Sequence, residues 1–514
     1  MSADLHSSSV TEATLNFLAL GGSGARALEP LLHMCALGLG PGRLRVILID
    51  PDQSNAGVTR ARETIDAYRR AREALAARGA ADSFFRTEVL DPVREQTVWS
   101  PIQDEQFMPS ARFDARVDRN SMTGSAAPLG RLFDTLFARR IRDMDLDMGF
   151  RGVPSIGTVF MHRLRDERFF EQLLTYAHSE GDSRYFAVGS VFGGTGASAL
   201  PVVGRSLVEG IQPEGRAADI EGVDRSRVGA AIFLPYFTLP SADATHAPDG
   251  GVRPEAALFA QNAAAALPMY MHDPVGYSSI YVLGDAQPRE QERNAVGGAA
   301  QDNRPHYVEF FAALAALDFM GRGGEPESGD RPAFHVTAVK GTNVTWDDLP
   351  LDAASLRSLM GGVTAVYTFL RAFQNGGRIR HDLDSALKGV TWLDPIDLRS
   401  GAVKEHGEAM QRTADYFHRV WDWLAALRAS TPSAQFIRSA NVERTPVGEA
   451  LEFRQSPPEK RRLDDVHDAF RYWNEESHRM RDRRGLPGLM EVMRRGSELL
   501  AEKHFGAPEP GGAR

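Results

Sequence analysis

Short, mainly apolar runs alternate with longer segments of helical spacing along residues 16–320. The runs lie at 16–20, 46–49, 186–191, 228–237 and 279–283. Runs of this kind are typical of parallel strands that are covered on both faces of a sheet. Between them, apolar residues recur every three or four positions and predict helices. The pattern predicts an α/β fold with a doubly wound, mostly parallel sheet.

The pattern changes in the second part of the chain. There the apolar spacing predicts amphipathic helices at about 353–377, 404–429, 461–484 and 488–504. A few short strands are easily missed in such a region, and Ala450 to Phe453 is a candidate. The chain is therefore expected to end in a helix-rich C-terminal region.

A stretch rich in glycine, proline and charge, GRGGEPESGDRP, gives the clearest domain boundary. The predicted parts are a flexible tail at 1–15, an α/β domain at 16–320 with an insertion at 60–120, a linker at 321–335, a second domain at 336–456 and C-terminal helices at 457–514.

A glycine-rich loop follows the strand predicted at 186–191. Gly193, Gly194 and Gly196 lack a Cβ, so backbone N–H groups can come close to a ligand. Thr195 adds a hydroxyl, and the predicted helix behind the loop adds its N-terminus, which favours anions and above all phosphate. The loop is predicted to bind phosphate. The alternative is a turn that only joins a strand to a helix.

A second glycine loop follows the first predicted strand. Gly22, Gly24 and Ala27 fit the dinucleotide fingerprint GxGxxG/A, and Asp50 follows the next strand, close to where a ribose-binding acid lies. On this segment alone, an NAD-binding Rossmann enzyme is the favoured interpretation. The glycine loop at 193–196 argues against an NAD-binding enzyme, because a Rossmann dinucleotide site uses only one such loop.

Together the two loops resemble those of the tubulin and FtsZ superfamily. The sequence FGGTGASALPVVG resembles the family's phosphate signature GGGTG[ST]G, which is followed by a helix containing proline. It matches at 193–196 and Pro201, and it departs at Phe192, Ala197 and Ser198. In this family both glycine loops bind the phosphates of one GTP. The resemblance is to divergent bacterial members and implies a tubulin/FtsZ-like GTP-binding domain over 16–320.

Further segments resemble other loops of the family, in the family's order. LIDPDQSN resembles the second loop, and MTGSAAPLGR, ending at Arg131, resembles the third, which senses the γ-phosphate. In this family a strand that ends in proline precedes the ribose site, and an asparagine at the start of a helix contacts the guanine. The resemblance implies that GTP or GDP, with Mg²⁺, is bound by Gly21, Gly22, Ser23, Gly24, Asp50, Asp52, Gln53, Gly124, Ser125, Gly193, Gly194, Thr195, Gly196, Ala197, Ser198, Pro235, Asn303 and Tyr307.

Several of these segments have a simpler interpretation. The Met122–Arg131 segment is otherwise a surface loop before a helix. Asn303 is otherwise a helix cap, and Tyr307 a core residue. The acidic ribose contact of the family has no clear counterpart, although Asp249 is a candidate.

The sequence NVTWDDL, from Asn343, resembles the family's catalytic loop NLDFADV. Asp348 matches the second catalytic aspartate, whereas Thr345 replaces the first, with Asp347 as a substitute. In the family this carboxylate polarises the water that attacks the γ-phosphate of a neighbouring subunit's GTP. The resemblance implies catalytic roles for Asn343, Asp347 and Asp348. The alternative is an acidic flank of the following helix.

Composition narrows the class of protein. The net charge of −9 argues against a general nucleic-acid or anionic-membrane binder. The single cysteine, Cys35, excludes an internal disulfide and fits a reducing cytoplasm. No apolar run approaches membrane-spanning length and no signal-peptide pattern opens the chain, so a cytoplasmic protein without direct membrane insertion is expected.

Three functions fit the sequence. The first is a GTPase that assembles with itself into an oligomer or filament and hydrolyses GTP at the subunit contact. The second is a GTP-binding switch or scaffold subunit of a bacterial multiprotein system with little hydrolysis, whose helical C-terminal region binds a protein partner. The third is a dinucleotide-binding enzyme that uses NAD.

Overall fold

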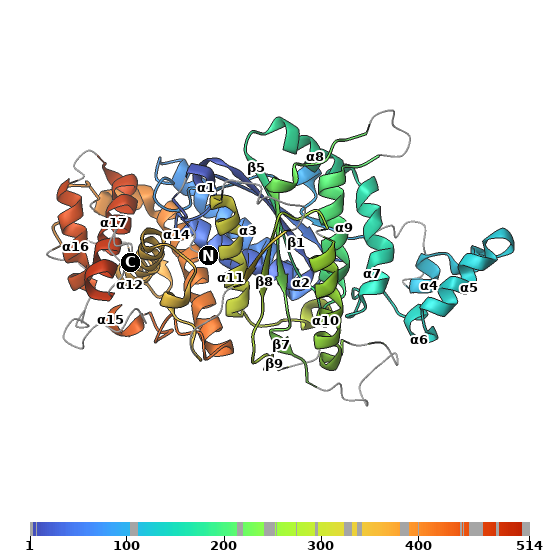
Figure 1. The fold of residues 1–514 in the computed structure, drawn as a ribbon. Coiled ribbons are helices and arrows are strands. Elements are labelled where there is room, and N and C mark those ends of the chain that lie inside the picture. The colour runs from blue at the N-terminus through green and yellow to red at the C-terminus, as the bar shows by residue number, and fades with distance from the viewer. Residues whose placement is uncertain are drawn as a thin grey trace.

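A parallel eight-stranded sheet forms the centre of the molecule (Figure 1). The strands follow the order β10-β8-β6-β5-β1-β2-β3, and β4 also pairs with β2. Their bounds are β1 Thr14–Leu20, β2 Arg43–Ile49, β3 Glu88–Val89, β4 Val98–Trp99, β5 Ser183–Ser190, β6 Val228–Phe233, β8 Ser279–Leu283 and β10 Ala333–Val336. From β1 the chain builds the sheet outward in one direction, and from β5 in the other, which makes the sheet doubly wound.

The computed structural model describes most of the chain. The described residues are 4–6, 8–102, 112–212, 219–240, 252, 254–273, 275–292, 297–322, 332–336, 342–380, 390–398, 400–442, 445, 447–451, 466–479 and 483–505. Two small strand pairs lie outside the main sheet, β7 (Phe237–Thr238) with β9 (Arg289–Glu290) and β11 (Gln374–Asn375) with β12 (Arg378–Ile379).

The register of the central strands decides where a ligand can bind. Leu20 at the end of β1 is level with Ile49 at the end of β2 and with Gly189 near the end of β5. Every residue of β1 and β5 is buried, as expected for strands covered on both faces. The order reverses between β1 and β5, so the loops after these strands lie beside a crevice at the carboxyl edge of the sheet.

Helices cover both faces of the sheet (Figure 1). One face carries α2 (Gly21–Ala36), α3 (Ala56–Ala76) and α11 (Tyr307–Gly321), and the other carries α8 (Arg168–Ser179), α9 (Thr195–Glu209) and α10 (Ala256–His272). The helix after β1 and the helix after β5 are thus on opposite faces, and both begin at the crevice.

The C-terminal region is helical, as predicted. Its helices are α12 (Ala353–Phe373), α14 (Ser400–Ser430), α15 (Val447–Ala450), α16 (Val466–Arg479) and α17 (Gly485–Phe505). Trp423 of α14 packs edge-on against Phe310 of α11 and His33 of α2. The mostly parallel sheet and this helical region confirm the predicted fold class.

Several predicted boundaries differ from the structure. The expected tail at 1–15 contains α1 (Ser8–Glu12) and the start of β1, and its Leu5 is buried and donates its N–H to Ser355 Oγ at 2.8 Å. The expected insertion at 60–120 includes most of α3 and both β3 and β4 of the sheet. The expected linker at 321–335 includes part of β10, and its residues 323–331 lie outside the described residues.

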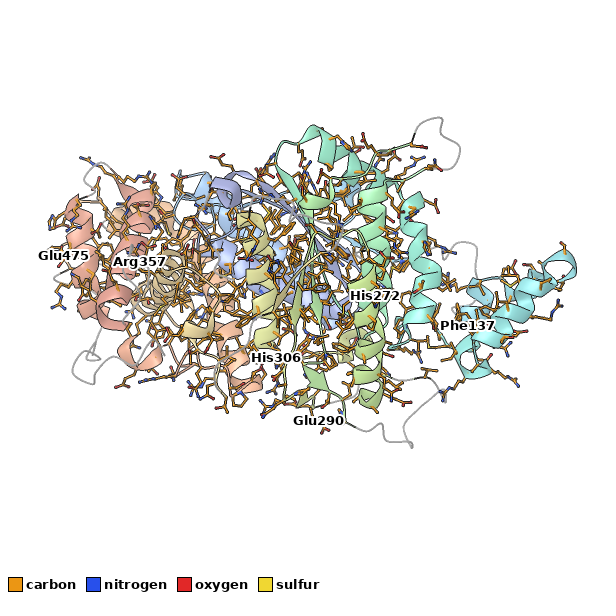
Figure 2. The ribbon with its side chains drawn as sticks, viewed as in Figure 1. Phe137, His272, Glu290, His306, Arg357 and Glu475 are labelled. Carbon is orange, nitrogen blue, oxygen red and sulfur yellow. The ribbon has the colours of Figure 1, made fainter. Side chains whose placement is uncertain are left out.

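One segment projects from the body of the molecule as an arm, residues 112–147 (Figure 1). It contains α4 (Phe113–Arg116), α5 (Ala127–Leu136) and α6 (Arg139–Arg142), and α7 (Pro154–Met161) follows on the body. Phe113, Phe133 and Phe137 pack together inside it, and Figure 2 labels Phe137 in the arm. Local aromatic packing therefore holds the arm together.

None of the described helices is both long enough and apolar enough to span a membrane.

Two helical glycines give a matched test of this packing. A Cβ on Gly24 in α2 would lie 2.3 Å from the carbonyl oxygen of Val188 in β5, whereas a Cβ on Gly407 in α14 has no described atom within 4 Å. We expect Gly24→Ala to lower the free energy of unfolding by about 1–3 kcal/mol. The same change at Gly407 is expected to raise it by about 0.5–1 kcal/mol. Thermal unfolding measures both; equal effects of one sign would contradict the close approach of α2 to β5.

Candidate functional site

The N-termini of α2 and α9 meet at the crevice. Helix α2 begins at Gly21 directly after β1, and α9 begins at Thr195 after the loop that follows β5. Among the described residues, no side chain caps either N-terminus. The first N–H groups of a helix have no partner within the helix and carry a positive partial charge, so two such ends side by side favour an anion.

Gly21 allows the two N-termini to touch. Its φ is +75°, a conformation that glycine adopts readily. A Cβ on Gly21 would lie 3.1 Å from Cβ of Thr195 and 3.3 Å from the backbone nitrogen of Gly196. The two glycine loops are thus parts of one site, although they are far apart in the sequence.

A cleft opens over these N-termini. It is lined by Gly21, Gly22, Ser23, Arg26, Asp50, Asp52, Asn55, Met148, Gly149, Phe150, Arg151, Gly152, Ser190, Phe192, Gly193, Gly194, Thr195, Gly196, Phe237, Leu239, Pro254, Phe259, Gln301 and Asn303. The lining combines the N-termini of two helices, the aromatic rings of Phe150, Phe192, Phe237 and Phe259, the carboxyl groups of Asp50 and Asp52, and the guanidinium groups of Arg26 and Arg151. This combination suits an anionic ligand that also has an apolar or aromatic part.

Asp50 and Asp52 form the acidic wall of the cleft. Asp50 Oδ1 accepts the N–H of Asp52 at 2.9 Å, and burial raises the pKa of Asp50 to about 8. Asp52 accepts from Ser54 N and Oγ through Oδ1, and from Gly298 N at 2.6 Å through Oδ2. Asp52 therefore fastens a distant segment of the chain to the end of β2.

That segment, residues 297–303, closes one side of the cleft. Asn55 caps α3 by accepting the N–H of Gly57 at 2.8 Å, and its amide donates to the side chain of Gln301. Arg60 forms an ion pair with Asp302. Together with the Asp52 contact, these bonds bring Gln301 and Asn303 to the cleft.

Arg26 joins α2 to the start of α11. Its Nε donates to Glu309 Oε1 at 2.5 Å and its Nη2 donates to the hydroxyl of Tyr236 at 2.5 Å. Burial opposes the charge on Arg26, but the adjacent Glu309 carboxylate raises the pKa of the guanidinium above its usual value. Glu309 also accepts the N–H of His306, which caps α11 and is labelled at its N-terminal end in Figure 2. Arg26 and Glu309 thus form a buried ion pair. Loss of either residue would leave the other charge buried without its partner and would strongly destabilise the fold.

The 148–152 segment forms the wall beside α9. A Cβ on Gly194 would lie 2.8 Å from Cβ of Phe150 and 3.2 Å from the backbone nitrogen of Gly152. The segment is therefore packed directly on the N-terminus of α9. Arg151 lies between Phe150 and Gly152 in the sequence.

Ten of the residues predicted to bind nucleotide line the cleft together. They are Gly21, Gly22, Ser23, Asp50, Asp52, Gly193, Gly194, Thr195, Gly196 and Asn303. The glycine loop after β1 and the glycine loop after β5 thus both line the cleft, on either side of the point where the strand order reverses.

Other predicted residues lie nearby without lining the cleft. Gly24 faces the strands, and the Ser198 hydroxyl donates to the carbonyl of Gly194 at 2.9 Å inside α9. The Tyr307 hydroxyl interacts with Asp285. Burial raises the pKa of Tyr307, and the Asp285 carboxylate raises it further. Gln53, Ala197 and Pro235 are half-buried, also outside the lining.

Gly124 and Ser125 are not where the resemblance places them. Both are exposed, they belong to the arm of residues 112–147, and neither lines the cleft. The short glycine and alanine turn of this segment looks the same in sequence whether it faces a ligand or solvent, so the pattern could not distinguish the two. The 148–152 segment lies at the cleft instead.

The predicted catalytic loop is also in an unexpected place. Head-to-tail assembly joins the cleft end of one copy to the opposite end of the next, so a loop that acts on a neighbour's ligand should lie at that opposite end. In the structure, Val344 forms a bridge with Ala434, and the Trp346 ring lies 5.0 Å from that of Phe436. Phe436 in turn contacts Phe310 in the first turn of α11, at the cleft end of the molecule.

The side chain of Asp348 has a local structural role. Its Oδ2 accepts the N–H and the hydroxyl of Thr345, at 2.8 and 2.9 Å, and so caps the short 3₁₀ turn Trp346–Asp348. Asp347 and Asn343 are exposed beside it. The simpler interpretation, an acidic cap before α12, agrees with these contacts.

Sequence reasoning missed several cleft residues. Arg26, Asn55, Phe150, Arg151 and Gln301 come to the cleft through contacts between elements that are distant in the sequence. Only Asn55 carried a local signal, as an asparagine directly before a helical pattern.

No protein-family model and no curated protein matches this chain. Among solved structures, CetZ1 from Haloferax volcanii, a GDP-bound monomer, aligns with 53% of this chain and 51% of its own, at 9% identity and a TM-score of 0.25. This chain therefore spans about half the length of CetZ1. CetZ2 from Haloferax volcanii, a GTPγS-bound protofilament, aligns with 69% of this chain and 72% of its own, at 11% identity and a TM-score of 0.27. At such low similarity neither likeness bears on function.

The raised pKa of Asp50 predicts a pH effect on stability. Between the unfolded value of 3.8 and about 8, the folded chain holds a proton on Asp50 that the unfolded chain has lost, so stability falls as pH rises through this window. Asp50→Asn removes the titration, so the melting temperature of the variant relative to the parent should increase from about pH 5 to about pH 9. Thermal unfolding of the ligand-free chain measures it. The exposed Asp66→Asn is the control; a constant difference for Asp50→Asn would show that Asp50 is ionised in the folded state.

Asp348→Ala separates the capping role from the catalytic one. Loss of the cap should lower the free energy of unfolding by about 1 kcal/mol, while nucleotide affinity and any GTP turnover stay at the level of the parent. Asn343→Ala is the neighbouring control and should change neither. Unaltered stability with lost turnover would instead restore Asp348 as a catalytic residue.

Proposed function

We propose that this chain is a tubulin/FtsZ-like protein that binds a guanine nucleotide in the cleft between α2 and α9. The observation that carries the proposal is the contact between Gly21 and Thr195, which brings two uncapped helix N-termini to one point. A nucleotide's phosphates supply the negative charge that such a point favours.

Different residues of the chain would bind the phosphates and the base of the nucleotide. Backbone N–H groups of Gly22, Ser23 and Gly194 would hold the phosphates, and Asn303 would face the base. Asn303 enters the cleft beside the start of α11, on the α2 side. The choice of guanine rests on the tubulin-like order of the loops, because an amide side chain can pair with the edge of several bases.

Magnesium would come with the nucleotide. Asp50 and Asp52 offer two carboxylates in the cleft, and the described residues hold no group of three metal-binding side chains. Mg²⁺ is commonly bound by one or two carboxylates together with phosphate oxygens, and it neutralises phosphate charge there. A bound cation would also favour the ionised form of Asp50.

NAD is the weaker candidate. The doubly wound order and Asp50 fit a dinucleotide site, which extends across the switch point. Phe150 and Gly152 pack on Gly194 at the N-terminus of α9, so we infer less room for a second nucleoside on that side. A mononucleotide with several phosphates suits the remaining space better.

A nucleotide-dependent switch or scaffold fits better than hydrolysis between subunits. The Asn343–Asp348 segment lies at the cleft end, and its Asp348 serves as a cap. Contacts of Phe310 with Trp423 and Phe436 join the start of α11 to the C-terminal helices, which we propose as the side that engages a protein partner. Self-assembly stays a prediction, and sedimentation with and without nucleotide tests it.

Gly193→Leu tests the proposed function. Gly193 lines the cleft, and a Cβ there meets only the hydroxyl end of Ser190 at 2.7 Å, so the fold should tolerate the change. The larger side chain would displace phosphate from N–H groups worth about 1.5–3 kcal/mol each, weakening GTP and GDP binding about a hundredfold or more.

Isothermal titration of nucleotide-free protein measures this effect, with Gly181→Leu on the open surface as the matched control. The parent should bind GTP and GDP and should not bind NAD. Binding of NAD alone, or full nucleotide binding by Gly193→Leu, would overturn the proposed site.

A further inference from the structure

The projecting arm carries three exposed leucines. Leu129, Leu132 and Leu136 of α5 have exposed fractions of 55%, 53% and 65%. Their spacing of three and then four residues places them in one stripe along the helix. Phe133 and Phe137 of the same segment are buried and pack against each other in the core of the arm. The stripe is therefore a separate apolar surface that the packing of the arm does not use.

Helix α10 gives a second exposed apolar surface, on the body of the molecule. Its residues from Ala256 to Met271, AALFAQNAAAALPMYM, include no charged side chain. Leu258 and Met271 are 41% and 60% exposed, and Ala264 and Ala265 are exposed between them. A helix without a charged face is normally buried on all sides. An exposed surface of this kind indicates a contact with another molecule.

The two surfaces are complementary in shape. The stripe on α5 has large branched side chains, whereas the middle of the exposed face of α10 has alanines, which allow another helix to approach closely. In Figure 1 the arm projects beyond α7 and α10, away from the body. An arm in this position can lie on α10 of a second molecule.

Charge favours a second copy of this chain as that molecule. The arm, residues 112–147, contains seven arginines and six aspartates, whereas the whole chain has a net charge of −9, so the body is acidic. Asp134 and Asp143 of the arm form ion pairs with arginines of the arm. Arg131 and Arg140 are exposed and form no ion pair with a described residue. The arm is therefore attracted to the acidic body of another copy.

Two-fold symmetry would use each surface twice. In a symmetric dimer the arm of each copy would lie on α10 of the other, so that one assembly covers both leucine stripes and both α10 faces. A stable interface buries about 1,200 Å² or more in total. One stripe on the ten-residue α5 is small against this requirement, and the reciprocal arrangement doubles the buried area.

We propose that two copies of this chain form a dimer by exchanging arms, with the leucine stripe of each α5 packed on the exposed face of α10 in the other copy. The exposed leucines and alanines of this contact do not line the nucleotide cleft, so the dimer needs no nucleotide. The contact also differs from head-to-tail assembly, because a two-fold contact closes after two copies.

Sedimentation velocity of the full chain without nucleotide tests the proposal. Leu132→Glu and Ala265→Glu each place a charge in the contact and should weaken dimerisation about tenfold or more. Both positions are exposed, so the melting temperatures of the variants should match that of the parent. Val336→Glu, a matched change at an exposed apolar residue of β10, should leave the dimer unchanged.

Cross-linking tests which surfaces meet. The only cysteine, Cys35, is buried, so an introduced surface cysteine reacts selectively. Copies with Leu132→Cys, mixed with copies with Ala265→Cys that differ in mass, should give the mixed dimer with a short thiol-specific cross-linker. Neither variant should cross-link to itself.

Several results would overturn the proposal. One is a parent that stays monomeric at about 100 μM, where even a weak interface is occupied, whether or not its leucine stripe then binds anionic phospholipid vesicles. Another is a dimer that both glutamate variants leave intact. Self-cross-linking of Leu132→Cys would show that arm pairs with arm instead of with α10. All of these measurements are made without nucleotide, so they leave the proposed nucleotide site to its own test.

Discussion

The contact between the N-termini of α2 and α9 is the constraint on which the rest of the site depends. It requires β1 and β5 to be neighbours in register, a helix that starts directly after β1, a helix that starts after the 191–194 loop following β5, and glycine at position 21. Two helix ends of like partial charge repel each other in the absence of a counter-charge. The surrounding sheet must hold them together, and its fully buried central strands supply that stability.

Two further contacts position the other walls of the cleft around these helix ends. Asp52 anchors the segment that carries Asn303, and Arg26 anchors the start of α11 through Glu309. Both anchors join elements from the two ends of the α/β domain, so the cleft is complete only when the whole domain has folded. The same start of α11 contacts the C-terminal helices, which gives ligand binding a direct structural route to that region.

The sequence predicted those parts of the fold and the site that are encoded locally. Apolar runs predicted the strands, helical spacing predicted the C-terminal helices, and glycines next to a strand predicted both glycine loops of the cleft, at 21–24 and 193–196. The sequence failed where position depends on packing between distant segments. The turn at Gly124 and the turn at Gly149–Gly152 have similar composition, and only the tertiary fold decides that the second faces the cleft. Likewise, the sequence could not show that the carboxylate of Asp348 accepts the N–H of Thr345 as a cap; its catalytic role stays a prediction.

The most direct test of the central claim is hydrogen exchange of the backbone amides with and without GTP. If both helix ends bind the phosphates of one nucleotide, the amides of residues 21–24 and 193–196 should become protected together, at one nucleotide per chain. Protection of 21–24 alone, or protection of that loop by NAD and not by GTP, would contradict the account and favour a dinucleotide site.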